Sequence, residues 1–307
     1  MKVLVATEKP FAAAAVAGIR NIVEGAGHTL ALLEKYTSKE ELLAAVADAD
    51  ALIVRSDKVT AEVADAAKNL KIVVRAGAGF DNLDLDALSA HKVVAMNTPG
   101  QNANAVAELA IAMMIFMCRN QFTPATGSEV MGKKIGIQAF GNVGRLVGKK
   151  AEALGMSVMA IDPFIPSEKI KEMGATPAES LDELYGSCNF VSIHIPATPE
   201  TIGSIGYNLI TQMPKGAVLI NTARKEVIDE VGLEKALEDR PDLKYATDIA
   251  PGNYAQLREK FGERVFATPK KMGAQTAEAN LNAGLAAANQ ICAFFADGCT
   301  KFQLNKF

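Results

Sequence analysis

The sequence predicts an α/β protein with two doubly wound parallel-sheet domains, and three observations support this. Short runs rich in Val, Ile and Leu alternate with alanine-rich segments of helical period, which is the pattern of βαβ units. The alternation occurs in two series, separated by a polar, Gly-containing stretch at 119–132. The length of 307 residues suits two domains of about 150 residues each.

The first series begins at the N-terminus. We expect strands at Val3–Ala6, Thr29–Leu33, Ala51–Val54, Lys71–Arg75 and Val93–Ala95, and helices at Ala12–Glu24 and Lys39–Val46. A long apolar helix, Asn102–Met117, follows, with Asn102 at the position of an N-cap.

The second series begins after residue 132. We expect its strands at Lys134–Gln138, Ser157–Ile161, Phe190–Ile193, Ala217–Asn221, Lys244–Asp248 and Arg264–Ala267. Helix-like segments separate these strands. The last helix, Gln275–Phe295, is long enough to return from the second series to the first.

Composition excludes several classes of protein. The 32 basic and 35 acidic residues give a formal charge of -3, so no positive field is available for nucleic acid. No apolar run reaches the roughly 20 residues of a membrane-spanning helix, and the N-terminus lacks the features of a signal peptide. We therefore expect a cytoplasmic protein. Cys118, Cys188, Cys292 and Cys299 are widely spaced, which indicates reduced packing residues and no metal site.

A glycine-containing loop between the first strand and first helix of the second series carries the strongest local signal. It reads A-x-G-x-x-G, with Ala139 at the first glycine position. Gly141 would let the backbone approach a pyrophosphate, the N–H groups of Asn142 and Val143 would point at it, and Gly144 would allow close packing of helix on strand. The competing interpretation is a tight strand–helix turn of any α/β protein.

Asp162 strengthens the interpretation of this loop as a phosphate loop. It ends the strand that follows the loop, where an acidic side chain binds the adenosine ribose hydroxyls of NAD. A carboxylate there would repel the 2′-phosphate of NADP. The alternative is a solvated acid at a strand end.

Four further segments identify a family. They are RAGAGFDNLD at Arg75–Asp84, NTPGQNANAVAE at Asn97–Glu108, VSIHIPATPET at Val191–Thr201 and INTARKEVID at Ile220–Asp229. In this order they resemble the D-2-hydroxyacid dehydrogenases, and within them the D-3-phosphoglycerate dehydrogenases, over nearly the whole chain. The resemblance implies a flavodoxin-like substrate domain from 1–98 plus 286–307, a Rossmann NAD-binding domain from 99–285, and a cleft between them.

The resemblance also implies which residues bind substrate. Arg224 would hold the substrate carboxylate and polarise the C2 oxygen, a task that suits a planar guanidinium. The backbone N–H groups of Ala78 and Gly79 would bind the same carboxylate as an anion-binding nest. Asn102 would lie near the substrate, although its role as a helix cap is an equal alternative.

A phosphorylated substrate needs additional cations. Arg55 and Ser56 follow a predicted strand of the first series, at the edge where such sheets bind ligands, and they resemble the phosphoglycerate subgroup. Surface charges that keep the protein in solution are the competing interpretation.

The resemblance places a set of residues along the cofactor, with Asp248 able to bond the nicotinamide carboxamide. His194 belongs to this set, so we expect it to contact the cofactor or pack rather than act as acid/base. The set comprises His194, Ile195, Pro196, Thr222, Ala223, Asp248 and Gly273.

The chain departs from the family at the acid/base. The family uses a histidine in a Thr-Pro-His turn and a glutamate that orients it, whereas this chain has Lys270 at the histidine position and Asn253 near the glutamate position. Either the protein binds NAD without catalysis, or Lys270 transfers the proton. We favour catalysis, because Arg224, the nest and a basic group are present together, and because a lysine base needs desolvation or a neighbouring cation rather than a carboxylate.

The resulting hypothesis is NAD-dependent oxidation of D-3-phosphoglycerate to 3-phosphohydroxypyruvate, the first step of serine biosynthesis, with Arg224 and Lys270 as catalytic residues. A glyoxylate or hydroxypyruvate reductase of the same family is one alternative, and an NAD-sensing interaction protein that turns over poorly is another. A small-molecule substrate and a homodimer are expected, without nucleic acid or membrane partners.

Overall fold

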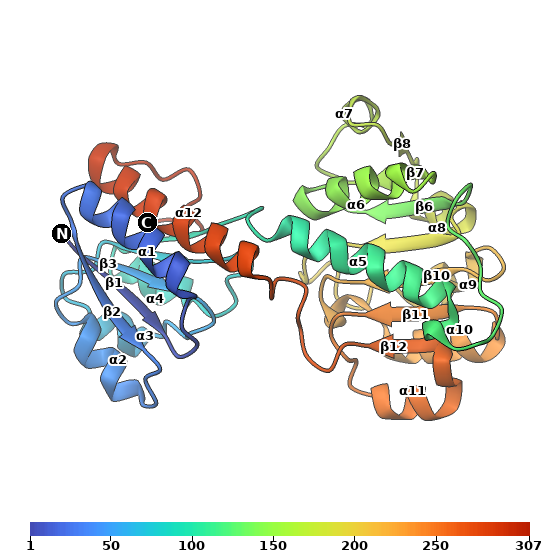
Figure 1. The fold of residues 1–307 in the computed structure, drawn as a ribbon, viewed down its shortest axis with the longest axis horizontal. Coiled ribbons are helices and arrows are strands. Elements are labelled where there is room, and N and C mark those ends of the chain that lie inside the picture. The colour runs from blue at the N-terminus through green and yellow to red at the C-terminus, as the bar shows by residue number, and fades with distance from the viewer. The chain divides into compact units, whose positions relative to one another are not determined.

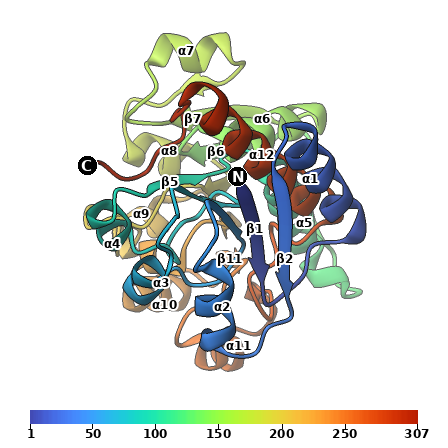
Figure 2. The same ribbon diagram turned by 90° about the vertical axis from the view of Figure 1, so that its left-hand side faces the viewer.

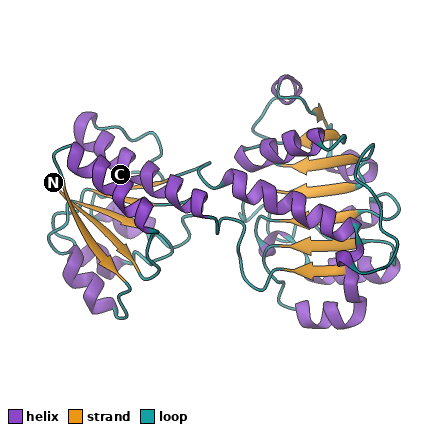
Figure 3. Ribbon diagram, in the orientation of Figure 1, coloured by secondary structure: helices purple, strands orange, loops and turns teal.

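The computed structural model describes all 307 residues, which form two compact units (Figure 1). Unit 1 comprises Met1–Asn102 and Gln275–Phe307, and unit 2 comprises Ala103–Ala274. Each unit has one parallel β-sheet flanked by helices (Figure 3). The predicted fold class is confirmed.

The sheet of unit 1 has the order β2-β1-β3-β4-β5, and every neighbouring pair is parallel. Figure 2 shows β1 and β2 side by side. The strand order reverses between β1 and β3, and in sheets of this kind ligands bind beyond the carboxyl ends of the strands at that point. The strands are β1 (Lys2–Thr7), β2 (Thr29–Glu34), β3 (Ala51–Val54), β4 (Ile72–Arg75) and β5 (Val94–Asn97).

Five helices cover the two faces of this sheet. One face carries α1 (Ala13–Gly25) and α12 (Ala277–Asp297), and the other carries α2 (Lys39–Val46), α3 (Ala61–Ala66) and α4 (Leu85–Ala90). Glycines let α1 and α12 lie close together (Figure 1). A Cβ at Gly18 would lie 2.4 Å from Leu285, and one at Gly284 would lie 3.0 Å from Ile19. The C-terminal helix therefore completes the core of unit 1.

The sheet of unit 2 has the order β12-β11-β10-β9-β6-β7-β8 and is also parallel throughout. Its strand order reverses between β6 and β9, which places a second switch point there. The short strand β8 was not predicted from the sequence. The strands are β6 (Lys134–Gln138), β7 (Ser157–Ile161), β8 (Thr176–Pro177), β9 (Phe190–Ile193), β10 (Val218–Asn221), β11 (Lys244–Thr247) and β12 (Val265–Ala267).

Helices cover both faces of the second sheet as well. One face carries α5 (Ala103–Cys118), α6 (Asn142–Ala153) and α7 (Ser167–Glu172), and the other carries α8 (Leu181–Ser187), α9 (Tyr207–Gln212), α10 (Glu230–Asp239) and α11 (Tyr254–Phe261). Three short 3₁₀ turns are η1 (Asn120–Phe122), η2 (Lys225–Val227) and η3 (Gly262–Arg264). None of the helices combines the length and the apolar character that crossing a membrane requires.

The four cysteines are unpaired, as expected from their spacing. Cys118 and Cys188 are buried and pack in the two cores of unit 2. The expectation that all four are packing residues is wrong for Cys299, which is exposed beyond the end of α12.

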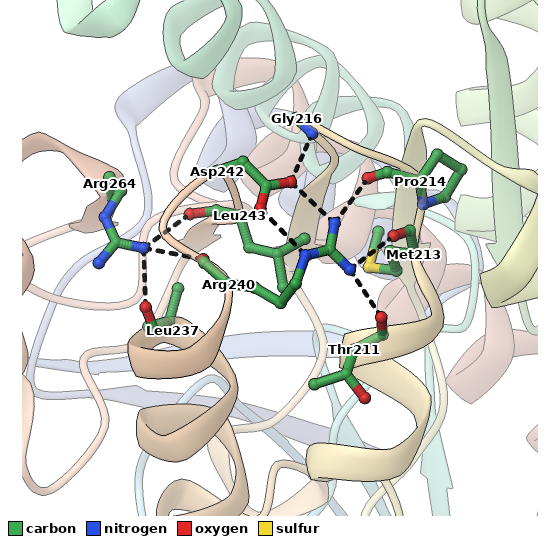
Figure 4. A network of polar contacts seen from close by, with 9 residues as sticks. All are labelled: Thr211, Met213, Pro214, Gly216, Leu237, Arg240, Asp242, Leu243 and Arg264. Carbon is green, nitrogen blue, oxygen red and sulfur yellow. Dashed lines mark hydrogen bonds and ion pairs between the residues drawn. The ribbon is translucent and has the colours of Figure 1, made fainter.

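A polar network lies at the amino-terminal edge of the unit 2 sheet, where it joins the loops before β10 and β11 (Figure 4). Arg240 forms a bidentate ion pair with Asp242 and donates to the carbonyl oxygens of Thr211 and Met213. Asp242 also accepts the N–H of Gly216 at 2.7 Å. The Arg240 guanidinium holds the pKa of the Asp242 carboxyl well below its usual range. This pair fixes the loops that lead into β10 and β11.

We predict that Asp242→Asn lowers the free energy of unfolding by about 1 to 2 kcal/mol at neutral pH, because the charged acceptor is lost. The folded pKa lies below the unfolded one, so the wild-type stabilisation is present above about pH 4 and is lost as the pH falls. Urea unfolding at several pH values measures this. A difference between variant and wild type that stays constant from neutral pH to below pH 4 would contradict the assignment.

Candidate active site

The loop between β6 and α6 has the backbone conformation that a glycine would adopt. Ala139 has a φ of +74°, in the left-handed region, which costs a residue with a Cβ about 1 to 2 kcal/mol. A Cβ at Gly144 would lie 2.2 Å from the carbonyl oxygen of Ala139. The close packing of α6 on the loop therefore requires glycine at position 144. Ala139, which replaces the first glycine of the usual pattern, has a strained backbone.

The amino-terminal end of α6 fits an anionic group. Gly141 is the N-cap residue and makes no side-chain cap, and nothing lies within 4 Å of a Cβ placed on it. The N–H groups of Asn142 and Val143 belong to the first helical turn, where no intrahelical acceptor exists. Because the helix dipole is positive at this end, the open glycine and these N–H groups can hold a pyrophosphate.

Asp162 is tied directly to this loop. It follows β7, and its carboxylate accepts the N–H of Phe140 at 2.8 Å and the N–H of Phe164 at 2.9 Å. These contacts fix the acid beside the loop while each oxygen retains capacity for a further donor. The carboxylate thus lies where the ribose hydroxyls next to a bound pyrophosphate could donate to it.

His194 follows β9, across the switch point from β6. Its N–H donates to the carbonyl oxygen of Gln138 at 2.9 Å, and its ring lies 3.0 Å from the Ser192 hydroxyl and 3.4 Å from the Thr222 hydroxyl. Desolvation by the surrounding protein lowers the pKa of His194 to about 3. The neutral imidazole therefore serves in a hydrogen-bonded network at neutral pH. Of its neighbours, Ile195 is buried and Pro196 is exposed.

Asn221, at the end of β10, holds the loop that carries Arg224. Its amide donates to the carbonyl oxygen of Arg224 at 2.8 Å and accepts the N–H of Ala223 at 2.9 Å. The Arg224 guanidinium donates to the carbonyl oxygen of Ala223 at 3.1 Å. Sequence reasoning missed Asn221, although a fully buried amide that ends an apolar strand is the available signal.

Asp248 holds the turn that carries the two lysines. It follows β11 and is 1% exposed. One oxygen accepts the Thr268 hydroxyl at 3.0 Å and the N–H of Met272 at 2.9 Å, and the other accepts the N–H of Gly273 at 2.8 Å. Both oxygens therefore bind the turn, and the predicted contact of Asp248 with the nicotinamide carboxamide stays a prediction. Gly273 packs against it, since a Cβ there would lie 2.9 Å from the carboxylate.

The two lysines of this turn have different surroundings. Lys270 is exposed, so of the two means that the sequence hypothesis offered, desolvation and the neighbouring Arg224, this structure does not supply desolvation. Lys271 reaches the Arg224 loop, with its ammonium 3.4 Å from the carbonyl oxygen of Ala223. Asn253 precedes α11 and has a buried side-chain oxygen without a hydrogen-bond partner. Sequence reasoning did not single out Lys271.

Unit 1 contains the other predicted substrate residues. The Ala78 carbonyl oxygen accepts the Asn97 amide at 2.6 Å, which fixes the Gly-rich turn after β4. The N–H groups of Ala78 and Gly79, the predicted anion-binding nest, belong to this turn. Asn102 precedes the first residue of α5.

The Arg55 side chain makes hydrogen bonds and a ring contact within unit 1. Its guanidinium donates to the carbonyl oxygen of Lys9 at 3.0 Å and to the Asn280 side chain at 2.5 Å, and it lies over the Phe11 ring. Burial lowers the pKa of the guanidinium, an effect that Asp57 partly offsets. Arg55 thus joins the β1 loop to the first turn of α12, while Ser56 beside it is exposed.

Comparison with known families and sequences agrees with this geometry. Residues 103–270 match the family described as D-isomer specific 2-hydroxyacid dehydrogenase, NAD binding domain. A D-3-phosphoglycerate dehydrogenase from Methanocaldococcus jannaschii is 36% identical over 83% of this chain and 51% of its own. A hydroxypyruvate reductase from Thermotoga maritima is 34% identical over 83% of this chain and 88% of its own. The chain spans about half the length of the first of these relatives.

A solved structure is similar along the whole chain. The NAD⁺-bound 3-phosphoglycerate dehydrogenase of Entamoeba histolytica is 50% identical, with a TM-score of 0.90 and coverage of 100% of this chain and 99% of its own. The similarity includes both units.

Substitution of two glycines in the loop between β6 and α6 should separate an effect on NAD binding from an effect on packing. We predict that Gly141→Ala retains stability but weakens NAD binding at least about 10-fold, because its methyl group occupies the space before the helix N-terminus. Gly144→Ala should instead lower the free energy of unfolding by about 1 to 3 kcal/mol through its clash with Ala139. Calorimetric titration and urea unfolding measure the two effects. Normal NAD affinity in a folded Gly141→Ala protein would contradict the phosphate site.

We predict that Asp248→Asn lowers the free energy of unfolding by about 2 to 3 kcal/mol, because the new amide group must face a backbone N–H donor in a buried position. Urea unfolding measures the loss, with Glu259→Gln, at an exposed carboxyl of α11, as the control. If Asp248→Asn and the control have the same free energy of unfolding, the hydrogen bonds from Thr268, Met272 and Gly273 to the carboxylate do not stabilise the fold.

Proposed function

Because this chain belongs to the D-isomer specific 2-hydroxyacid dehydrogenase family, we propose that it oxidises D-3-phosphoglycerate to 3-phosphohydroxypyruvate with NAD. That reaction would make it the first enzyme of serine biosynthesis. The observation that carries the proposal is the convergence of three loops at the carboxyl edge of one sheet: the phosphate loop, the Arg224 loop and the lysine turn. The substrate assignment is supported by the phosphoglycerate dehydrogenases to which the chain is similar.

NAD is held by unit 2 in this proposal. The N–H groups of Asn142 and Val143 bind the pyrophosphate beside Gly141, and Asp162 accepts the ribose hydroxyls. The neutral His194 and Thr222, with Ala223, border the remainder of the cofactor. Bound NAD supplies the acceptor for the hydride that leaves C2 of the substrate.

Arg224 and Lys270 perform the substrate chemistry. Arg224 binds the carboxylate and stabilises the charge that develops on the C2 oxygen, which a permanently charged guanidinium can do throughout the reaction. Lys270, in its neutral form, accepts the hydroxyl proton as the C2–O bond becomes a carbonyl, and in the reverse direction its ammonium donates that proton. The oxidation should therefore accelerate as the pH rises above neutrality.

Unit 1 contributes anion-binding groups to the proposal. The N–H groups of Ala78 and Gly79 bind a carboxylate, with Asn102 as an additional polar contact. Arg55 and Ser56 are assigned to the phosphate group. Since Arg55 donates to Asn280 in this structure, binding of a phosphate would exchange that neutral acceptor for a charged one.

Hydroxypyruvate reduction is the second candidate, and the Thermotoga maritima relative supports it. It uses the same hydride and proton transfers in the opposite direction. The two candidates differ in whether the substrate carries a phosphate group. Comparison of kcat/KM for 3-phosphoglycerate and D-glycerate distinguishes them, because only the first depends on Arg55.

We predict that Lys270→Ala lowers kcat about 10²- to 10⁴-fold, the usual contribution of a general base, with NAD affinity unchanged. NADH absorbance at about pH 9 with NAD and 3-phosphoglycerate measures turnover, and Lys225→Ala, at an exposed lysine beside the Arg224 loop, is the control. Full turnover by Lys270→Ala would remove Lys270 from the mechanism. A wild-type protein that binds NAD but oxidises no hydroxyacid would instead support an NAD-sensing interaction protein.

A further inference from the structure

One buried carboxylate joins three loops at the carboxyl edge of the unit 1 sheet. Asp57 is 6% exposed and lies in the loop after β3, two residues past Arg55. One of its oxygens accepts the N–H of Glu8 at 2.7 Å and the hydroxyl of Tyr36 at 2.9 Å, and the other accepts the N–H of Arg55 at 3.2 Å. Glu8 follows β1 and Tyr36 follows β2, so the carboxylate connects the loops after all three strands, at the point where the strand order reverses.

These contacts fix the Arg55 side chain as well as its backbone. The guanidinium donates to the carbonyl oxygens of Lys9 at 3.0 Å and Pro10 at 3.2 Å, in the loop that begins at Glu8. Asp57 therefore acts on Arg55 in two ways. It binds the backbone N–H of Arg55 directly, and it holds the loop whose carbonyl oxygens bind the guanidinium. Loss of a buried acceptor would leave such donors unpaired, which is costly.

The same segment is also bonded to the Gly-rich turn after β4. The Asn82 amide donates to the carbonyl oxygen of Asp57 at 2.7 Å and to that of Arg55 at 3.3 Å. This turn contains the predicted carboxylate nest. The backbone from Arg55 to Asp57 is thus bonded to neighbouring loops on both sides, and Ser56 between them is exposed.

We propose that Asp57 is a positioning residue that gives the enzyme its preference for a phosphorylated substrate; this inference rests on the proposed function. The carboxylate is occupied by three donors and would repel a phosphate, so it acts through Arg55 and Ser56. A guanidinium that the protein already holds in place loses less conformational entropy on binding than a free one. The phosphate therefore binds more tightly when Asp57 is present.

A purely structural role for Asp57 predicts a different outcome. If the carboxylate only stabilises the fold, its loss affects substrates with and without a phosphate group equally. If it positions Arg55 and Ser56, its loss affects only the phosphorylated substrate. The effect then falls on KM rather than kcat, because the groups proposed to transfer the hydride and the proton are bound to unit 2 or belong to it.

The experiment compares Asp57→Asn, Asp57→Ala and Asp50→Asn with the wild-type enzyme, all as the full chain. Asp50 is a matched control, because its carboxylate also accepts a backbone N–H of β1, that of Lys2 at 2.7 Å, but it lies before β3 at the opposite edge of the sheet. At saturating NADH, KM and kcat are measured for 3-phosphohydroxypyruvate and hydroxypyruvate, two substrates that differ only in the phosphate group. NADH fluorescence measures, without turnover, the dissociation constant of 3-phosphoglycerate from the NADH-loaded enzyme.

We expect Asp57→Asn to raise both KM for 3-phosphohydroxypyruvate and the dissociation constant of 3-phosphoglycerate about 10-fold. An amide offers one acceptor oxygen where the carboxylate offers two, so at least one backbone N–H loses its bond. Asp57→Ala loses all three bonds and should raise both quantities at least as much. The KM for hydroxypyruvate, and every parameter of Asp50→Asn, should stay within about twofold of wild type. Asp57→Asn keeps the size of the side chain and decides the question if Asp57→Ala does not fold.

Three results for Asp57→Asn would overturn the inference while the proposed function stands. Equal increases in KM for the two substrates would show a general structural role. No increase for either would show that the loops are held without the carboxylate. A change confined to kcat would place the effect on the chemical step. A wild-type enzyme that binds no 3-phosphoglycerate and does not prefer 3-phosphohydroxypyruvate to hydroxypyruvate would overturn the proposed substrate, and this inference with it.

Discussion

The parallel direction of the strands is the constraint on which the candidate site depends. When all strands of a sheet run the same way, their carboxyl ends meet at one edge, and every loop after a strand opens there. In unit 2 this edge receives Ala139 after β6, His194 after β9, Arg224 after β10 and Asp248 after β11. Residues far apart in the chain therefore become neighbours without any special connection between them.

Buried polar side chains at the strand ends turn this edge into a set of fixed loops. Asn221 and Asp248 are each about 1% exposed, and each satisfies backbone groups of the segment that carries a cation. A buried amide or carboxylate left without such donors would be costly, so the loop conformation and the polar residue depend on each other. The cations themselves remain at the surface of the unit, where they can reach a ligand.

The amino-terminal edge of the unit 2 sheet carries a stabilising ion pair, and the carboxyl edge carries the candidate site residues. Arg240 and Asp242 form their bidentate pair at the amino-terminal edge, and Arg240 also donates to the carbonyl oxygens of Thr211, Met213 and Pro214. No residue of the proposed chemistry lies there. The strained Ala139, the neutral His194 and the cations Arg224 and Lys271 all lie at the opposite edge. Backbone strain and desolvated side chains are typical of edges where a ligand binds.

The sequence by itself determined the two parallel-sheet units and the family, and it predicted a phosphate loop, because hydrophobic period and short motifs are local signals. It also identified Arg224 and Lys270 as candidates. Only the tertiary structure decided that Asp248 binds the lysine turn, that Asn221 holds the Arg224 loop and that Lys271 meets Arg224 at Ala223. Those contacts join segments separated by up to 48 residues. The partners of Asp248 and Lys271 follow from the order of β10, β11 and β12 in the sheet, which no local pattern records.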